Sequence, residues 1–102
     1  MIDHVVMLAL RDSTDLTACR EVMDGLDQLT DEIPGFLSFT HGVNIDMEGK
    51  SPGYPYGFIA RFENRDALAR YAADPRHRAL GARLVALCGG ADRITVYDIE
   101  RD

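Results

Sequence analysis

The sequence predicts an α+β domain in which an antiparallel sheet carries helices on one face. Segments with the two-residue alternation of strands are interspersed with segments that have the three- and four-residue spacing of helices. Their order is strand, helix, strand, strand, helix with a second helical segment, strand, which is a split βαβ arrangement. The 102 residues contain no repeats or linkers and have the length of one domain, residues 1–102.

The first strand is expected from Ile2 to Leu10. Its side chains alternate between two faces that are both largely apolar, and His4 is the polar exception on the face of Val6 and Leu8. A strand that is buried on both faces belongs in the middle of its sheet, or between a helical layer and another sheet. We therefore expect this strand to be central.

The first helix follows three candidate N-cap residues, Asp12, Ser13 and Thr14, and ends at Pro34-Gly35. Its buried side recurs at three- and four-residue spacing, as expected for a helix that packs on a sheet. The residues of this stripe are Cys19, Val22, Met23, Leu26, Leu29 and Ile33.

Two strands come next, from Phe36 to Ile45 and from Tyr54 to Phe62, joined by a polar loop from Asp46 to Gly53. The apolar face of the first of these strands includes His41, for which the nearby Asn44 indicates a role in loop support or at a dimer edge. The second carries an aromatic ladder on one face. Its members are Tyr54, Tyr56, Phe58, Ala60 and Phe62.

The next helix begins at Glu63-Asn64, and a third helix follows Asp74-Pro75. Asp74 is a good N-cap, and proline suits the first helical position because its missing N–H has no partner there. The third helix stops at Gly89-Gly90, and a last strand runs from Arg93 to Glu100. The inner stripes of the two helices are Ala67, Leu68, Tyr71 and Ala72, then Leu80, Leu84, Leu87 and Cys88.

The corner between these helices is a candidate functional site. His77 falls in the first turn of the third helix, where the helix dipole disfavours imidazolium, so the ring is expected to be neutral near pH 7. Tyr71 closes the preceding helix. A phenol and a neutral imidazole at one corner can act together on a small molecule, although capping alone explains Asp74 and Pro75.

Composition narrows the function classes. A net charge of −6 with scattered basic residues argues against a nucleic-acid partner. Cys19 and Cys88 lie at apolar helical positions, which indicates buried thiols in a reducing compartment. No segment has the length of a membrane span, so we expect a soluble cytoplasmic protein. His4, His41 and His77 lie on separate elements, and a metal site is not indicated.

Both faces of the predicted strands are rich in apolar residues, and helices cover only one of them. The expected solution is a second copy of the chain whose sheet packs on this one, giving a homodimeric barrel.

Several short segments together resemble the stress-responsive A/B barrel family, also called Dabb. They are Ile2 to Val6, Ile33-Pro34-Gly35, Gly42-Val43-Asn44, Phe62-Glu63, Tyr71 to His77 and Val96-Tyr97-Asp98, and they span nearly the whole chain. The resemblance implies a ferredoxin-like subunit and a homodimeric α+β barrel.

The family includes cofactor-independent polyketide cyclases that resemble olivetolic acid cyclase, which close a linear polyketide by aldol condensation. The resemblance implies that His77 is the catalytic base and Tyr71 its partner, without a metal or cofactor. It also implies that His4 and Asp98 match pocket residues, whereas Tyr56 replaces a pocket histidine. Together with Val6, these residues would line the cavity.

Two hypotheses of different class follow. In the first, a cavity between sheet and helices binds or transforms a carbonyl-containing metabolite. In the second, the protein is a noncatalytic stress or assembly module whose interior is filled by side chains such as Phe58, Leu68 and Leu84. A cofactor-independent monooxygenase of the antibiotic-biosynthesis type remains open by analogy of fold.

Overall fold

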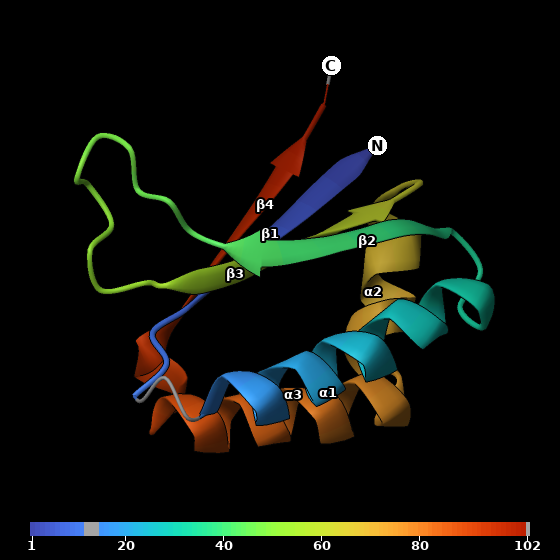
Figure 1. Ribbon diagram of the computed structural model, residues 1–102. Coiled ribbons are helices and arrows are strands. Elements are labelled where there is room, and N and C mark those ends of the chain that lie inside the picture. The colour runs from blue at the N-terminus through green and yellow to red at the C-terminus, as the bar shows by residue number, and fades with distance from the viewer. Residues whose placement is uncertain (12–14, 102) are drawn as a thin grey trace.

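The molecule has two layers, a twisted sheet and a set of helices that cover one face of it (Figure 1). The computed structural model describes residues 1–11 and 15–101. Within these residues, four strands form one sheet in the order β2-β3-β1-β4, and all neighbours are antiparallel. The strands are β1 (Ile2–Leu8), β2 (Phe36–Val43), β3 (Tyr56–Phe62) and β4 (Ile94–Glu100). The α+β architecture and the central position of the first strand are confirmed.

The helices agree with the predicted order. They are α1 (Leu16–Gln28), α2 (Arg65–Ala73) and α3 (Pro75–Cys88), with short 3-10 turns η2 (Leu29–Asp31) and η3 (Ala91–Arg93). Asn64 caps α2 by accepting a hydrogen bond from the Ala67 N–H at 2.9 Å. Asp74 caps α3 in the same way, accepting from the Arg76 N–H at 2.9 Å. The N-cap candidates Asp12, Ser13 and Thr14 lie outside the described residues.

The core lies between the helices and the sheet face that carries the even-numbered residues of β1 and β3. Alternation along a strand sends every second side chain to the same face, which is why these positions are buried together. Both cysteines are buried and free, as expected for structural thiols. The strand residues of this core are Ile2, Val6, Leu8, Phe36, Tyr56, Phe58, Ala60 and Phe62.

The strands on either side of the β2–β3 loop are shorter than predicted. β2 ends at Val43 instead of Ile45, β3 begins at Tyr56 instead of Tyr54, and the loop extends over residues 44–55. The Asn44 amide donates to the Tyr54 carbonyl at 2.8 Å and to the Ser51 hydroxyl at 2.9 Å. The Asp46 carboxylate accepts hydrogen bonds from two loop N–H groups at 2.8 and 2.9 Å. The Asn44 N–H still donates to the Pro55 carbonyl at 2.9 Å, but Pro55 has no N–H to return the bond. Beyond this point the backbone bonds to loop side chains, so the strands end earlier than alternation predicts.

Three side chains lie away from their predicted positions. Tyr54 lies before the start of β3 and is not part of the aromatic ladder. Its hydroxyl accepts a hydrogen bond of 2.7 Å from the Thr95 hydroxyl of β4, which holds the side chain away from the ladder. Leu37 is 48% exposed, because a bulge between Phe36 and Ser38 removes it from the alternation. Ala72 is exposed on the outer side of α2. No helix in the described part of the chain combines the length and apolar character that a membrane span requires.

Candidate functional site

Tyr71 occupies the centre of the candidate site, at the C-terminal end of α2. The residue is only 1% exposed. Its ring packs between Phe36 and Phe62 of the sheet, at centroid distances of 5.1 and 4.9 Å. Such aromatic contacts hold the ring in one orientation, so the hydroxyl group has a defined position beneath the sheet.

His77 lies directly against Tyr71 because the Asp74-Pro75 corner turns the chain back on itself. The two rings are 3.9 Å apart between centroids, with an angle of 35° between their planes. Burial is the main cause that lowers the pKa of His77, and the nearby His4 lowers this pKa further. A hydrogen bond with the backbone of Ala72 acts in the opposite direction and raises it. The predicted neutral imidazole near pH 7 therefore has a physical cause, which is mainly desolvation.

The polar atoms of this pair lack partners. The Tyr71 hydroxyl oxygen and the His77 Nδ1 atom are buried, and neither has a hydrogen-bond partner within the described residues. An unsatisfied buried polar group costs about 1–3 kcal/mol, and nearly all such groups in folded proteins are paired. Burial also raises the pKa of Tyr71, so the phenol keeps its proton. The pair thus keeps one hydroxyl and one imidazole nitrogen without hydrogen-bond partners among the described residues.

His4 and Asp98 form a second polar pair beside Tyr71. The register of β1 and β4 places the two residues opposite each other, and His4 Nδ1 lies 2.5 Å from the Asp98 carboxylate. A carboxylate can only accept a hydrogen bond, so His4 Nδ1 donates and carries the proton. The other ring nitrogen of His4, Nε2, takes no part in this bond. The His4 ring meets Tyr71 edge to face at 5.8 Å. The Asp98 side chain is 46% exposed, which gives this side of the cluster contact with solvent.

Val6 and Tyr56 lie farther along the same sheet face. Val6 is buried two residues beyond His4. Tyr56 pairs with Leu8, whereas the β3 partner of His4 is Ala60, four residues away. Four strand residues span about 13 Å. The packing of α2 and α3 on the sheet therefore brings His4, Tyr71, His77 and Asp98 together, whereas Tyr56 lies farther along the sheet.

Tyr56 instead pairs with His41 on the neighbouring strand. Its hydroxyl and His41 Nδ1 share a hydrogen bond of 2.6 Å. The pair was not predicted from the sequence, in which His41 was associated with Asn44, whose amide instead bonds inside the loop. The signal was present: both residues alternate onto the helix-facing side of adjacent antiparallel strands.

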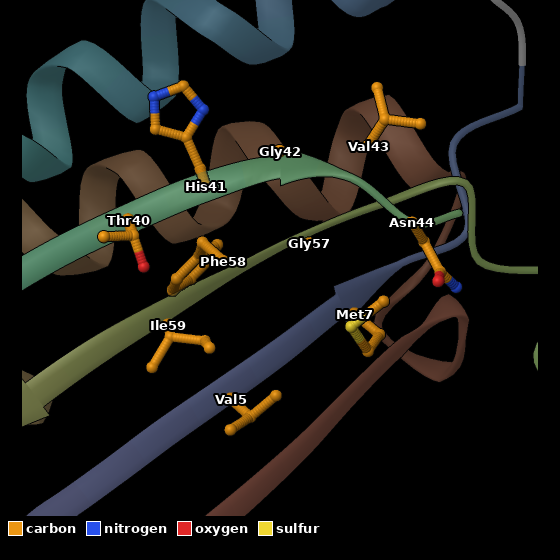
Figure 2. A pocket seen from close by; sticks show the side chains of 10 residues that line it. All are labelled: Val5, Met7, Thr40, His41, Gly42, Val43, Asn44, Gly57, Phe58 and Ile59. Carbon is orange, nitrogen blue, oxygen red and sulfur yellow. The ribbon is translucent and has the colours of Figure 1, made fainter. Parts of the chain in front are cut away.

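Large side chains fill much of the space around the cluster. Phe58 and Leu84 are buried in the core, and Leu68 packs against it. Two surface depressions lie elsewhere. One, of about 250 Å³, is on the sheet face opposite the helices (Figure 2). The other lies beside Pro34 and Arg76. Neither is lined by Tyr71 or His77. No group of three metal-ligating side chains occurs within the described residues.

Comparison with known proteins places these features in a family. The model of the Stress responsive A/B Barrel Domain, Dabb, matches residues 2–101. A stress-response A/B barrel domain-containing protein of Arabidopsis thaliana, HS1, is 26% identical over 97 residues, which cover 95% of this chain and 86% of HS1.

Solved structures of other proteins have the same fold. A dimeric ferredoxin-like protein of unknown function from Jannaschia sp. CCS1 is 44% identical and superposes with a TM-score of 0.93, covering 98% of each chain. The hydroxynitrile lyase of Passiflora edulis shares the fold, with a TM-score of 0.81 at 11% identity over 99% of this chain and 93% of that one. The fold is thus ferredoxin-like, and the chain belongs to the stress-responsive A/B barrel (Dabb) family.

Proposed function

We propose that this protein is a homodimer that binds a small carbonyl-containing metabolite at Tyr71 and His77, and that His77 removes a proton from the carbon next to the carbonyl. The observation that carries the proposal is the pair of buried polar atoms without partners, the Tyr71 hydroxyl and His77 Nδ1. A carbonyl oxygen is an acceptor, which is what a phenol proton requires. Binding would therefore relieve the cost of an unsatisfied group.

The chemistry follows from the two environments. Desolvation favours the neutral imidazole of His77, which can accept a proton at physiological pH. The C–H bond gives its proton to His77, and its electron pair moves to form an enolate whose oxygen accepts a hydrogen bond from Tyr71. This hydrogen bond strengthens as negative charge develops on the oxygen. Attack of the enolate carbon on a second carbonyl of the same ligand would form the new C–C bond and leave an alkoxide, which takes the proton back from His77. This is the aldol closure that the family resemblance implies.

The other predicted site residues would contribute less directly, according to their distance from Tyr71. Asp98 orients His4 through their 2.5 Å contact, and His4 forms the wall of the site next to Tyr71. Val6 supplies apolar surface beside it. Tyr56 lies too far along β3 to contact a small ligand at Tyr71, so it would contact only one that extends along the sheet.

The homodimer is supported by relatives and by surface composition. The Jannaschia protein, 44% identical to this chain over 98% of its length, is described as dimeric. On the sheet face opposite the helices, Ile59, Tyr97 and Ile99 are 41–60% exposed. Large apolar side chains gathered on one face are typical of an interface.

Solvent deuterium exchange tests the proposal. 4-Phenyl-2-butanone is incubated with the protein in D₂O at pD 7, and loss of the proton signals next to its carbonyl is followed by ¹H NMR. We expect the wild-type protein to accelerate exchange, and His77→Ala and Tyr71→Phe to remove most of the acceleration while remaining folded. Exchange at the rate of the protein-free control, with no chemical-shift changes on ketone addition, contradicts the proposal.

The filled interior favours a second candidate, a noncatalytic stress-associated dimer. Phe58 and Leu84 occupy the space in which a large cavity would lie. In that case the Tyr71 ring serves only as core, and neither ketone binding nor exchange is observed.

A further inference from the structure

The sheet face opposite the helices has a trough whose cause is a pair of glycines. Gly42 of β2 and Gly57 of β3 are direct cross-strand partners, and Met7 of β1 is the next residue in the same row. With no side chains at the two glycine positions, a depression lies next to the neighbouring cross-strand pair Thr40 and Ile59, and Val5 and Met7 of β1 also line it (Figure 2). The depression has a volume of about 250 Å³.

The space around the two glycines differs: an added Cβ would clash within this chain at Gly57 but not at Gly42. A Cβ at Gly57 would lie 2.6 Å from the Met7 sulfur and 2.8 Å from the Val6 carbonyl oxygen, so packing within this chain requires it. A Cβ at Gly42 would meet nothing within 4 Å, and its φ is not in the left-handed region. Glycine weakens a strand and often marks a place where another group approaches closely. The described fold gives Gly42 no such neighbour.

The same face also carries a projecting aromatic side chain. Tyr97 of β4 is paired with Val5 and is 60% exposed, on the side of the sheet away from the helices. A two-fold interface is self-complementary, so a surface that bears both a projection and a matching depression can pair with a copy of itself.

We propose that Tyr97 of each copy inserts into the Gly42–Gly57 trough of the other copy, and that Gly42 is glycine to admit it. The proposal rests on the homodimer proposed above and specifies how its two sheets are aligned. Tyr97 lies on β4, at one edge of the sheet, and the trough lies on β2 and β3, toward the other edge. At ordinary strand spacing the two are about 10–15 Å apart on the same face. Reciprocal insertion places the two-fold axis midway between them, over the central strands β1 and β3.

An axis over the central strands has two consequences. Both insertions occur at once, and the sheets overlap over most of their width. The Met7 sulfur, which lies over Gly57, is then positioned to meet the Tyr97 ring, a contact that is favourable between thioethers and aromatic rings.

The test is the dissociation constant of the dimer, measured by sedimentation velocity of fluorescently labelled full-length protein over a dilution series. Gly42→Val places a branched side chain in the trough, at a position where an added Cβ meets nothing within 4 Å, and valine suits a strand. We expect it to weaken the dimer by about tenfold or more. The matched control is Gly81→Val on α3, where an added Cβ also meets nothing within 4 Å and the helix layer lies away from the open sheet face. We expect the control to leave the dissociation constant unchanged.

A double variant makes the test specific for Tyr97. Tyr97→Ala alone should weaken the dimer, and adding it to Gly42→Val should restore part of the affinity, because it removes the side chain that valine obstructs. An unchanged or tighter dimer for Gly42→Val, or simple additivity in the double variant, overturns the trough pairing while the homodimer stands. A monomeric wild-type protein overturns both. Ketone exchange tests the Tyr71–His77 site separately.

Discussion

The chain contains two histidine–tyrosine pairs that differ in how their polar atoms are used. Tyr56 and His41 share a hydrogen bond of 2.6 Å between neighbouring strands. Tyr71 and His77 instead lie with tilted rings whose centroids are 3.9 Å apart, and the hydroxyl and Nδ1 of this pair have no partner within the described residues. The two residues of the first pair satisfy each other's polar atoms, whereas the second pair keeps two buried polar atoms without partners.

The difference shows that residue type alone does not identify a site. A hydrogen-bonded pair at a sheet edge adds stability of about 0.5–1.5 kcal/mol and needs no ligand. A buried pair without partners lowers stability, and proteins that retain such groups use them for binding or chemistry in many cases. Tyr71 and His77 are therefore the pair proposed to bind a ligand, and the proposed role of Tyr56 and His41 is structural.

The largest expected effect separates the two histidines. His77→Ala should slow protein-catalysed deuterium exchange of 4-phenyl-2-butanone by about 100-fold or more, because general-base catalysis contributes factors of about 10² to 10⁴. His41→Ala should leave the exchange rate within about twofold of wild type. Equal losses in both variants, measured by ¹H NMR, would remove the distinction between the pairs.

An intermediate effect separates the two tyrosines. Tyr56→Phe removes the hydrogen bond to His41 and should lower the free energy of unfolding by about 1 kcal/mol. Tyr71→Phe removes an unpaired buried hydroxyl, so the free energy of unfolding should be unchanged or higher by about 1 kcal/mol. Urea denaturation at one fixed protein concentration measures both, since a dimer's stability depends on concentration. A large loss for Tyr71→Phe would reveal a structural bond to the hydroxyl.

The smallest expected effect is a pH dependence of stability. The folded-state pKa of His77 lies below its ordinary value of 6.5, so the unfolded chain binds more protons than the folded protein in the interval between the two values. Stability should therefore fall as pH falls from about 6.5 through the folded pKa, with a slope of at most about 1.4 kcal/mol per pH unit from this group. His77→Gln should flatten the curve in this interval. Identical curves for the two proteins would show that His77 is not desolvated.

Much of the fold could be predicted from the sequence because local signals agreed with one another. The Asp74-Pro75 corner is an example: the cap, the proline and the apolar stripes on either side all indicated two helices joined by a tight turn, and the structure has that turn. The strand ends near Asn44 and Tyr54 were wrong, because side-chain bonds within the loop compete with ladder bonds. Alternation of apolar residues carries no information about such bonds.

The candidate site was only partly predictable for a related reason. His4 and Asp98 are brought together by the pairing of β1 with β4, which depends on strand register across 94 residues of sequence. The sequence resemblance pointed to both residues, but their contact needed the sheet. The unpaired state of Tyr71 and His77 depends on every neighbouring side chain at once, so no local pattern contains it.

The most direct test of the central claim is ¹³C NMR of 4-phenyl-2-butanone labelled at the carbonyl carbon, recorded with the wild-type protein and with Tyr71→Phe. If the Tyr71 hydroxyl donates to the ligand, the carbonyl resonance moves downfield on binding to the wild-type protein, and the shift is lost in Tyr71→Phe. A resonance that stays at the position of the free ketone, or moves equally in both proteins, would contradict the assignment of Tyr71 and His77 as a ligand site.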